Sequence, residues 1–382
     1  MIERITILGG GVSGLGAAIL AKKKGFNVFL SEKKTLSKES KNLLIKNNID
    51  WEEGKHSINK IINSKEIIVS PGISNSSKII DKLNSLNIPI ISEVEFGFRY
   101  SKAKIVAITG TNGKSTTTKL IGDILKKKYR KTFVGGNLGQ PLCNSIKKNF
   151  KYTHHVVELS SFQLETIKKF NPNISVILNL SKDHLDRYKN INNYILAKKN
   201  ILNHGSKNIN LISIDDVYSN RIFLDKKVKN KIFFSTKKLT ADICYNKDYI
   251  IDNYFHKSKK IKLPNLSLDL YNSYNLQNIL AAYIVCKYFK IPIKYFHKSI
   301  KNFKGLPYRS LTIYNSKSKL IINNSKATNI SSALSTLENK KNIYLILGGI
   351  AKEDGFSKFK KFRKQIDQIY IYGKSRFKIK NQ

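Results

Sequence analysis

Two glycine-rich turns, each placed between an apolar strand-like run and a helical stretch, constrain this chain more than any other feature. The first turn is Gly9-Gly-Gly11-Val-Ser-Gly14, and the second is Thr109-Gly-Thr-Asn-Gly-Lys-Ser-Thr116. A strand that passes through such a turn into a helix opens a βαβ unit, whose strands lie parallel. The two turns therefore predict an α/β fold with parallel sheets.

Strand-like and helical stretches alternate along all 382 residues, a length sufficient for two or three domains. We predict three: a Rossmann-like domain over 1–95, a central parallel-sheet domain with a P-loop over 96–304, and an incomplete Rossmann-like domain over 305–382. The last segment is shorter than the ~100 residues that a doubly wound domain usually needs.

The individual elements follow from the apolar runs and their periodicity. Helices are predicted over about 13–24 and 275–289, and the lysine-rich patch Lys257–Lys262 is interpreted as a solvated loop. Strands are predicted at Ile5–Leu8, Asn27–Leu30, Ile67–Ser70, Lys104–Ile108, His155–Leu159, Ile174–Leu178, Lys319–Asn323, Ile343–Leu347 and Gln368–Tyr372.

The first turn satisfies the G-x-G-x-x-G pattern, and Glu32 stands close behind the next strand. Glycines there let the backbone approach a pyrophosphate at a helix N-terminus, and the acid can contact a ribose. This pattern is typical of NAD- or FAD-dependent enzymes, but the same geometry accepts any nucleotide diphosphate. An oxidoreductase, another nucleotide-binding enzyme and a tight turn without a ligand are all compatible with the motif.

The second turn has the composition of a phosphate-binding loop. Its backbone N–H groups can surround phosphates, Lys114 can neutralise the β and γ oxygens, and Ser115 can ligate Mg²⁺. The general NTPase pattern needs a further glycine where this chain has Ile108, so the loop is a shortened form. Phosphate-binding turns on two successive domains indicate an enzyme that couples a nucleotide-linked substrate to ATP chemistry.

The order of the motifs resembles that of the Mur ligases of peptidoglycan synthesis, most closely the branch that adds D-glutamate to UDP-N-acetylmuramoyl-L-alanine. The resemblance extends from residue 1 to about residue 373. It is carried by Ile108-Thr-Gly-Thr-Asn-Gly-Lys-Ser-Thr116, Gly135-Gly-Asn-Leu-Gly139, Glu158-Leu-Ser-Ser-Phe-Gln-Leu164, Asp183-His-Leu-Asp-Arg187, Gly305-Leu-Pro307, Ser325-Lys-Ala-Thr-Asn329 and Leu347-Gly-Gly349. All Mur ligases and folylpolyglutamate synthases share the phosphate loop, whereas Leu-Ser-Ser-Phe-Gln-Leu and Ser-Lys-Ala-Thr-Asn are characteristic of the glutamate-adding branch.

The resemblance implies an ATP- and Mg²⁺-dependent ligase that phosphorylates a carboxylate and lets an amine attack the acyl phosphate. The implied catalytic residues are Lys114, Glu158, His184 and Lys198, and the implied metal ligands are Ser115, Glu158, His184 and Lys198 as a carbamate. The implied ATP-binding residues are Gly110, Thr111, Asn112, Gly113, Lys114, Ser115, Thr116, Asn275 and Arg309. The UDP-substrate would contact Ser13, Gly14, Glu32, Lys33, Ser70, Pro71, Gly72, Asn137 and Ser160, and D-glutamate would contact Lys326, Thr328 and Lys352. Glu32 and Lys33 are equally compatible with a solvated turn.

Lys198 is placed by periodicity as well as by resemblance. A helical wheel through 190–203 puts it near the apolar stripe of Ile191, Ile195 and Leu202, which predicts an amine that faces inward. Lys199 lies only slightly further from this stripe, so the wheel does not separate the two lysines, and either could extend its amine to the surface.

Three positions depart from the family pattern. Tyr274 stands where the family has His before the adenine-contacting Asn, Tyr308 stands where it usually has His before Arg309, and Asn324 replaces an Asp expected near the ribose. Together they bear on whether the chain is fully active.

Composition limits the class of protein. Lys and Arg number 69 against 26 Asp and Glu, a net charge of +43, which suits phosphate-bearing partners but also fits a coding bias toward lysine. A basic nucleic-acid-binding protein or an inactive remnant is the non-enzymatic alternative, but no nucleic-acid motif accompanies the charge.

The three cysteines are far apart, and no apolar run reaches ~18 residues. We expect a cytoplasmic monomer that neither binds nucleic acid nor inserts into a membrane.

The third domain carries a separate expectation. Family members continue beyond the strand at Gln368–Tyr372 with segments that help to hold D-glutamate, and residues after Lys374 do not supply them. We expect exposed apolar surface on this domain, and binding of ATP and UDP-substrate with poor addition of D-glutamate.

Overall fold

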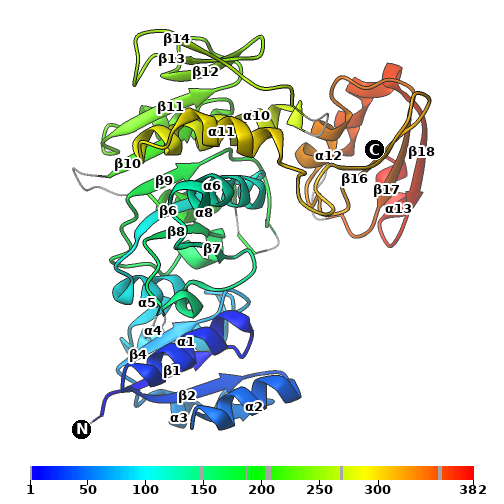
Figure 1. Ribbon diagram of the computed structural model, residues 1–382. Helices are drawn as coiled ribbons and strands as arrows, with labels where there is room; N and C mark the ends of the chain where they lie inside the picture. Colours follow the sequence, from blue (N-terminus) through cyan, green and yellow to red (C-terminus); the bar gives the residue numbers. More distant parts are fainter. Residues whose placement is uncertain are drawn as a thin grey trace.

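A computed structural model describes residues 2–382 except 147–149, 186, 189, 203–207, 267–269 and 352–354. Figure 1 shows an N-terminal unit in blue, a central unit from cyan to yellow, and a C-terminal unit in orange and red that lies beside helix α10 (Ser273–Tyr288). Each unit has its own sheet or pair of strands, so the molecule is a three-domain α/β protein. The domain boundaries predicted above remain a prediction.

The N-terminal unit is a five-stranded parallel sheet in the order β3-β2-β1-β4-β5. Its strands are β1 Arg4–Leu8, β2 Asn27–Glu32, β3 Asp50–Glu53, β4 Glu66–Val69 and β5 Ile90–Ser92, and its helices are α1 Val12–Lys23, α2 Lys38–Lys46, α3 Ile58–Ile61, α4 Lys78–Ser85 and α5 Glu93–Tyr100. Apolar residues of β1 and β4 are buried on both faces, as expected for a parallel sheet covered by helices.

The first glycine-rich turn joins β1 to α1 at close range. A Cβ on Gly14 would lie 1.8 Å from the Gly9 carbonyl oxygen, so the first turn of α1 can approach the strand only without a side chain at this position. This packing confirms the predicted strand, turn and helix.

The central unit is a nine-stranded sheet in the order β14-β13-β12-β11-β10-β9-β6-β8-β7, antiparallel only in the β12–β14 meander. Its strands are β6 Lys104–Thr109, β7 Thr132–Gly136, β8 His154–Glu158, β9 Ile174–Ile177, β10 Ile209–Ser213, β11 Lys231–Ser235, β12 Ile243–Asn246, β13 Tyr249–Asp252 and β14 Lys259–Lys262. Its helices are α6 Lys114–Lys128, η1 Leu142–Ser145, α7 Ser161–Leu164, α8 Ile191–Lys199, α9 Val217–Leu224, α10 and α11 Ile293–Lys301.

Side chains of β6 alternate between the two faces of this sheet. Val106 and Ile108 belong to the core that α6, α10 and α11 cover, whereas Ile105 and Ala107 belong to the core on the other face. The run from Lys104 onward is therefore a central strand that is buried on both sides.

One sequence-based interpretation was wrong. Lys257–Lys262 was expected to be a solvated loop, but Lys259–Lys262 forms the edge strand β14 against β13. Ile261 is 8% exposed and points into the core, while the lysines around it stay in solvent. Edge lysines are compatible with a strand that ends a sheet, and one apolar residue gave too little alternation to reveal it.

The C-terminal unit contains two separate pairs of strands. An antiparallel hairpin joins β15 Leu311–Asn315, which was not predicted, to β16 Leu320–Asn323, and β17 Ile343–Gly348 pairs in parallel with β18 Ile366–Tyr372. The helices are α12 Ile330–Leu337, η3 Phe356–Gln365 and α13 Arg376–Lys380. Tyr344 and Ile346 of β17 are 65% and 72% exposed. This agrees with the apolar surface expected on this domain.

A buried carboxyl group lies where the first two units meet. Glu93, the first residue of α5, is 1% exposed, and its Oε1 accepts a hydrogen bond of 2.6 Å from the Cys143 N–H. Its Oε2 has no hydrogen-bond partner among the described residues. Burial raises the pKa of Glu93 to about 7, with the Cys143 hydrogen bond opposing the shift.

We expect Glu93→Gln to stabilise the protein at pH 8. Between the unfolded pKa of 4.5 and the folded pKa of about 7, the folded state holds a proton that the unfolded state releases, so stability falls as pH rises through this window. The variant should be more stable than wild type by about 1–3 kcal/mol at pH 8, and the two should converge near pH 4.5. Urea unfolding midpoints measure this, with exposed Asp50→Asn as the control. If the unfolding midpoints of wild type and Glu93→Gln depend on pH in the same way, Glu93 does not have the raised pKa.

Candidate active site

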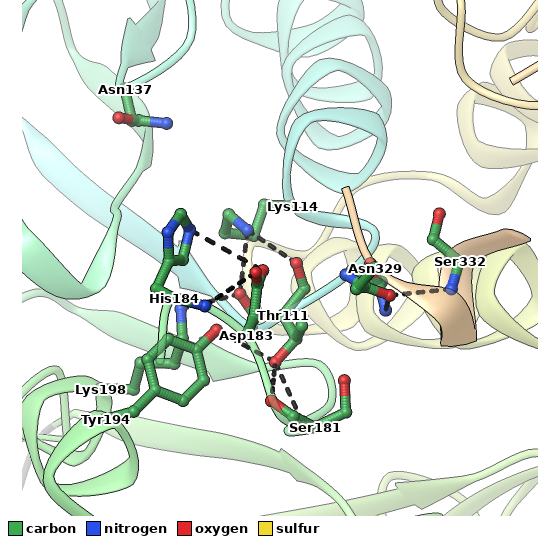
Figure 2. A network of polar contacts seen from close by, with 12 residues as sticks. Thr111, Lys114, Asn137, Ser181, Asp183, His184, Tyr194, Lys198, Asn329 and Ser332 are labelled. Atoms are coloured by element: carbon green, nitrogen blue, oxygen red, sulfur yellow. Dashed lines mark hydrogen bonds and ion pairs between the residues drawn. The ribbon is translucent and has the colours of Figure 1, made fainter. Parts of the chain in front are cut away.

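The candidate site lies at the carboxyl ends of three neighbouring strands of the central sheet. β8 and β9 flank β6 on either side, so the segments that follow the three strands meet at one edge. The phosphate loop follows β6, Glu158 ends β8, and Asp183 follows β9. Figure 2 shows Lys114, Asp183 and Lys198 gathered at this point. Carboxyl ends of parallel strands are the usual position for ligands in such sheets.

The amine of Lys114 forms hydrogen bonds with the backbone of its own phosphate loop. Lys114 Nζ donates hydrogen bonds of 3.0 Å to the Gly110 carbonyl oxygen and 2.8 Å to that of Thr111. Gly113 has φ +85°, and a Cβ there would lie 2.4 Å from Asn278 Oδ1, so the loop needs glycine at this position. Burial lowers the pKa of Lys114, and the nearby Glu158 and Asp183 partly oppose this effect.

Asn179 supports the loop and was not singled out from the sequence. Its Oδ1 accepts from the Asn112 N–H at 2.8 Å, and its Nδ2 donates to the Asn112 carbonyl oxygen at 3.1 Å. Its own carbonyl oxygen accepts from the Thr111 N–H at 2.7 Å. Three hydrogen bonds from one residue fix the loop. Its position two residues after β9, at the carboxyl edge, was the available signal.

Glu158 is buried with one oxygen available. The residue is 2% exposed, and its Oε1 accepts from Asn137 Nδ2 at 2.9 Å. Its Oε2 has no hydrogen-bond partner in the described part of the chain. A buried carboxylate oxygen without a protein partner is suited to a cation. Asn137, expected at the sugar, orients this carboxylate.

Asp183 and His184 lie in the segment that follows β9. The His184 N–H donates to Asp183 Oδ1 at 2.9 Å, and His184 Nε2 lies 3.7 Å from Asp183 Oδ2. His184 has φ +53°, an uncommon backbone conformation for a residue with a side chain. Its ring lies against Phe162, with 5.0 Å between ring centroids.

Lys198 faces inward, as the helical wheel predicted. It is 1% exposed, and its Nζ donates to the Gly110 carbonyl oxygen at 2.8 Å and to Thr109 Oγ1 at 3.2 Å. Lys199, in contrast, turns outward and pairs with Asp225. Burial, and next the charge of Lys114, hold the pKa of Lys198 well below its usual range. This shift favours the neutral form of the amine beside the phosphate loop.

Among the residues that the structure describes, no three His, Cys, Asp or Glu side chains are grouped closely enough to hold a metal ion. The donors nearest to such a site are Glu158 Oε2 and the hydroxyl of Ser115, which is 3% exposed at the first turn of α6. A complete metal shell would need oxygens from a bound phosphate or a modified lysine in addition.

The residues expected around the nucleotide lie on two domains. Asn275 is in the first turn of α10, and its Oδ1 accepts from Asn278 Nδ2 at 3.0 Å, next to Gly113 of the phosphate loop. Arg309 is exposed in the C-terminal unit, and its charge contributes to the lowered pKa of Lys114. The structure thus brings Arg309 toward the phosphate loop. Thr116 is buried in α6.

Several of the residues expected around UDP lie at or near the first glycine-rich turn, whereas Asn137 and Ser160 lie in the central unit. Ser70 Oγ donates to the Gly9 carbonyl oxygen at 3.0 Å. Both carboxylate oxygens of Glu32 accept hydrogen bonds from the backbone. The donors are the N–H groups of Gly10 at 2.6 Å and Lys34 at 2.9 Å. Ser13 is half-buried and Lys33 is exposed. Ser160 takes part in a capping box with Gln163 at the start of α7.

Arg187, to which the sequence assigned no role, attaches the loop after β4 to the central unit. Its guanidinium donates to the carbonyl oxygens of Pro71 at 2.8 Å and Ile73 at 3.0 Å, and it stacks 3.7 Å over the Phe162 ring. The loop that includes Pro71 and Gly72 is therefore held against the segment that carries His184.

The residues expected around D-glutamate have different outcomes. Lys326 and Thr328 are exposed on the segment that leads into α12, and the Lys326 N–H donates to the Tyr308 carbonyl oxygen at 3.0 Å. Lys352 lies outside the described residues.

Comparisons with known proteins identify the middle and the start of the chain. Residues 108–286 match the Mur ligase middle domain, and residues 4–79 match the MurD N-terminal domain. The chain is 35% identical over 377 residues to the UDP-N-acetylmuramoylalanine–D-glutamate ligase of Bacteroides thetaiotaomicron, with 97% of this chain and 84% of that protein covered. The protein of the same name from Buchnera aphidicola is 36% identical over 390 residues, with 97% and 83% covered.

Solved structures share the fold at lower identity. A MurF ligase from Thermotoga maritima in complex with ADP is 18% identical, with a TM-score of 0.57 and coverage of 91% of this chain and 81% of that one. A pseudomurein peptide ligase type C from Methanothermus fervidus is 20% identical, with a TM-score of 0.59 and coverage of 99% and 87%. Within the described ranges, no helix combines the length and apolar character needed to cross a bilayer.

Proposed function

The chain belongs to the Mur ligase family, and from this premise we propose that it joins D-glutamate to UDP-N-acetylmuramoyl-L-alanine in an ATP-dependent step of peptidoglycan synthesis. The observation that carries the proposal is the convergence of Lys114, Glu158 and Lys198 at the ends of adjacent strands beside a phosphate loop. The activity is that of an acid–amino-acid ligase, which forms an amide C–N bond.

The chemistry needs positive charge where a carboxylate meets a triphosphate. The substrate carboxylate attacks the γ-phosphorus, ADP leaves, and the amine of D-glutamate then displaces phosphate from the acyl phosphate. Lys114, released from its contacts with Gly110 and Thr111, is placed to neutralise the phosphate oxygens. Arg309 approaches the same charge from the C-terminal unit.

Mg²⁺ fits the residues that are present. Glu158 Oε2 and the Ser115 hydroxyl would hold it, together with His184 and a carbamylated Lys198. When bound, the ion would screen the repulsion between the carboxylate and the triphosphate. Glu158 Oε2, which has no hydrogen-bond partner within the described ranges, supports this assignment.

The lowered pKa of Lys198 supports its conversion to a carbamate. A neutral amine attacks CO₂, an N–C bond forms and one proton is released, which turns a potential cation into a carboxylate-like ligand. Such an anion would remove the mutual repulsion between Lys198 and Lys114, because the two groups would then carry opposite charges.

The substrate residues complete the proposal. UDP-substrate would be bound by Ser13, Gly14, Glu32, Lys33, Ser70, Pro71, Gly72, Asn137 and Ser160, and D-glutamate by Lys326, Thr328 and Lys352. Glu32 would act by shaping the turn through Gly10 and Lys34. We propose a cytoplasmic monomer with no nucleic-acid partner and no membrane insertion.

Phosphate release from ATP tests the function. We expect release to require UDP-N-acetylmuramoyl-L-alanine and to rise when D-glutamate is added, with L-glutamate and UDP-N-acetylmuramate as controls. Release that is indifferent to D-glutamate, or binding of NAD in preference to the UDP-sugar, would contradict the proposal. The rate of release with D-glutamate in the same assay tests the sequence-based prediction that D-glutamate is added poorly.

A further inference from the structure

An asparagine of the phosphate loop pairs directly with an asparagine of the C-terminal unit. Asn329 Nδ2 donates to Asn112 Oδ1 at 3.0 Å, and Asn112 Nδ2 donates to Asn329 Oδ1 at 3.3 Å. Figure 2 shows Asn329 beside the loop that carries Thr111 and Lys114. Asn329 is 7% exposed, so water competes little with this reciprocal pair.

Two further contacts surround the pair. The Tyr274 phenol, at the start of α10, lies beside the side chains of Asn112 and Ser331, which oppose the rise in its pKa that burial causes. At the other end of α12, Glu338 accepts hydrogen bonds from the Ser273 N–H at 3.1 Å and from Ser273 Oγ at 3.0 Å. Both ends of α12 are therefore attached to the central unit, and Tyr274, which departs from the family pattern, is part of one attachment.

The pair also connects two parts of the proposed reaction. The backbone N–H and carbonyl groups of Asn112, in the phosphate loop, form hydrogen bonds with the side chain of Asn179. On the other side, Asn329 caps α12 by accepting from the Ser332 N–H at 2.9 Å, and it directly follows Thr328 and stands three residues after Lys326. Asn329 therefore joins the phosphate loop to the segment assigned to D-glutamate.

We propose that Asn329 is a positioning residue that, through Asn112 and Tyr274, couples nucleotide occupancy of the phosphate loop to the placement of the D-glutamate segment. This inference rests on the proposed function. Asn329 affects D-glutamate through its contact with the phosphate loop and takes no part in the chemical steps. Loss of the pair should weaken D-glutamate use while ATP and UDP-substrate binding persist.

Asn329→Ser separates the pair from the helix cap. Serine is as good an N-cap as asparagine, so α12 should remain capped, but its short side chain cannot reach Asn112. We expect the KM for D-glutamate to rise about 5- to 100-fold, as for loss of two largely buried hydrogen bonds, with KM values for ATP and UDP-substrate within about twofold of wild type. Tyr274→Phe should shift the same KM in the same direction by less.

A second measurement does not depend on turnover. Mg-ADP should slow amide hydrogen exchange over residues 326–332 in wild type, and Asn329→Ser should lose this protection while still binding Mg-ADP. Asn323→Ser is the matched control, because Asn323 accepts from the Ser325 N–H within its own turn. It should behave like wild type in both measurements.

The outcomes separate the two proposals. Wild type without ligase activity but with Mg-ADP-dependent protection that Asn329→Ser abolishes would refute the proposed function and leave the coupling standing. Unchanged D-glutamate KM and unchanged protection in Asn329→Ser would overturn the coupling. An equal rise in the KM values for all three substrates, together with a lowered unfolding midpoint, would also overturn the coupling. That is the result expected if Asn329 has a structural role alone.

Discussion

Replacing Lys114 with alanine is expected to abolish ATP-dependent turnover while leaving UDP-substrate binding almost unchanged. The ammonium group is the cation of the phosphate loop, and its loss should remove at least ~2–4 kcal/mol of transition-state stabilisation. This corresponds to a decrease of about 30- to 900-fold in kcat/KM. The proposed UDP site lies on the N-terminal unit, away from this loop. Phosphate release and calorimetric titration with the UDP-substrate measure the two effects separately.

Lys119→Ala is the matched control for this experiment. Lys119 lies on the same helix and forms a half-buried pair with Asp123 at 2.6 Å, so its loss removes a positive charge without touching the loop. Normal turnover by Lys114→Ala, or an equal loss in both variants, would show that the phosphate loop is misassigned.

Lys198→Ala is expected to lower turnover at least as strongly, because it removes both a buried lysine and the proposed metal-binding carbamate. If the carbamate is present, a short carboxylic acid such as acetate or formate should occupy the space left by the side chain and partly restore the rate. Acid rescue distinguishes a missing ligand from a damaged fold. Turnover against acid concentration, at fixed Mg²⁺, is the measurement.

Lys199→Ala provides the control at the adjacent position. Lys199 pairs with Asp225 at the surface, so the variant should keep nearly full activity and show no response to added acid. Full activity of unrescued Lys198→Ala would show that the inward amine has no part in the reaction. Depletion of CO₂ should slow wild type and leave the rescued variant unaffected.

The phosphate loop was predictable because its function is local. Its glycines, Lys114 and Ser115 are consecutive, and the apolar strand before them and the helix after them fix the geometry of the loop. The inward direction of Lys198 was predictable for a similar reason, since helix periodicity alone relates it to its neighbours. Separating it from Lys199 required the observed contacts with Gly110 and Asp225.

The supporting residues were less accessible to sequence reasoning. Asn179 is one of many asparagines in the chain, and its three hydrogen bonds to the loop depend on β9 pairing beside β6. Glu32 matched a ribose-binding pattern, yet its oxygens are used by the turn itself. The strand β14 was missed because a single inward Ile261 produces no visible alternation.

Local sequence was sufficient to predict the parallel α/β units, the two glycine-rich turns and the chemistry that each turn can support, because these depend on residues within a few positions of one another. The three-dimensional fold determines which distant groups meet. It joined Asn112 to Asn329 across 217 positions, left one oxygen of Glu158 without a partner among the residues that the structure describes, and lowered the pKa of Lys198 by burying it beside Lys114. The physical reason is that burial and electrostatic coupling depend on distance in space, and separation along the chain does not specify that distance.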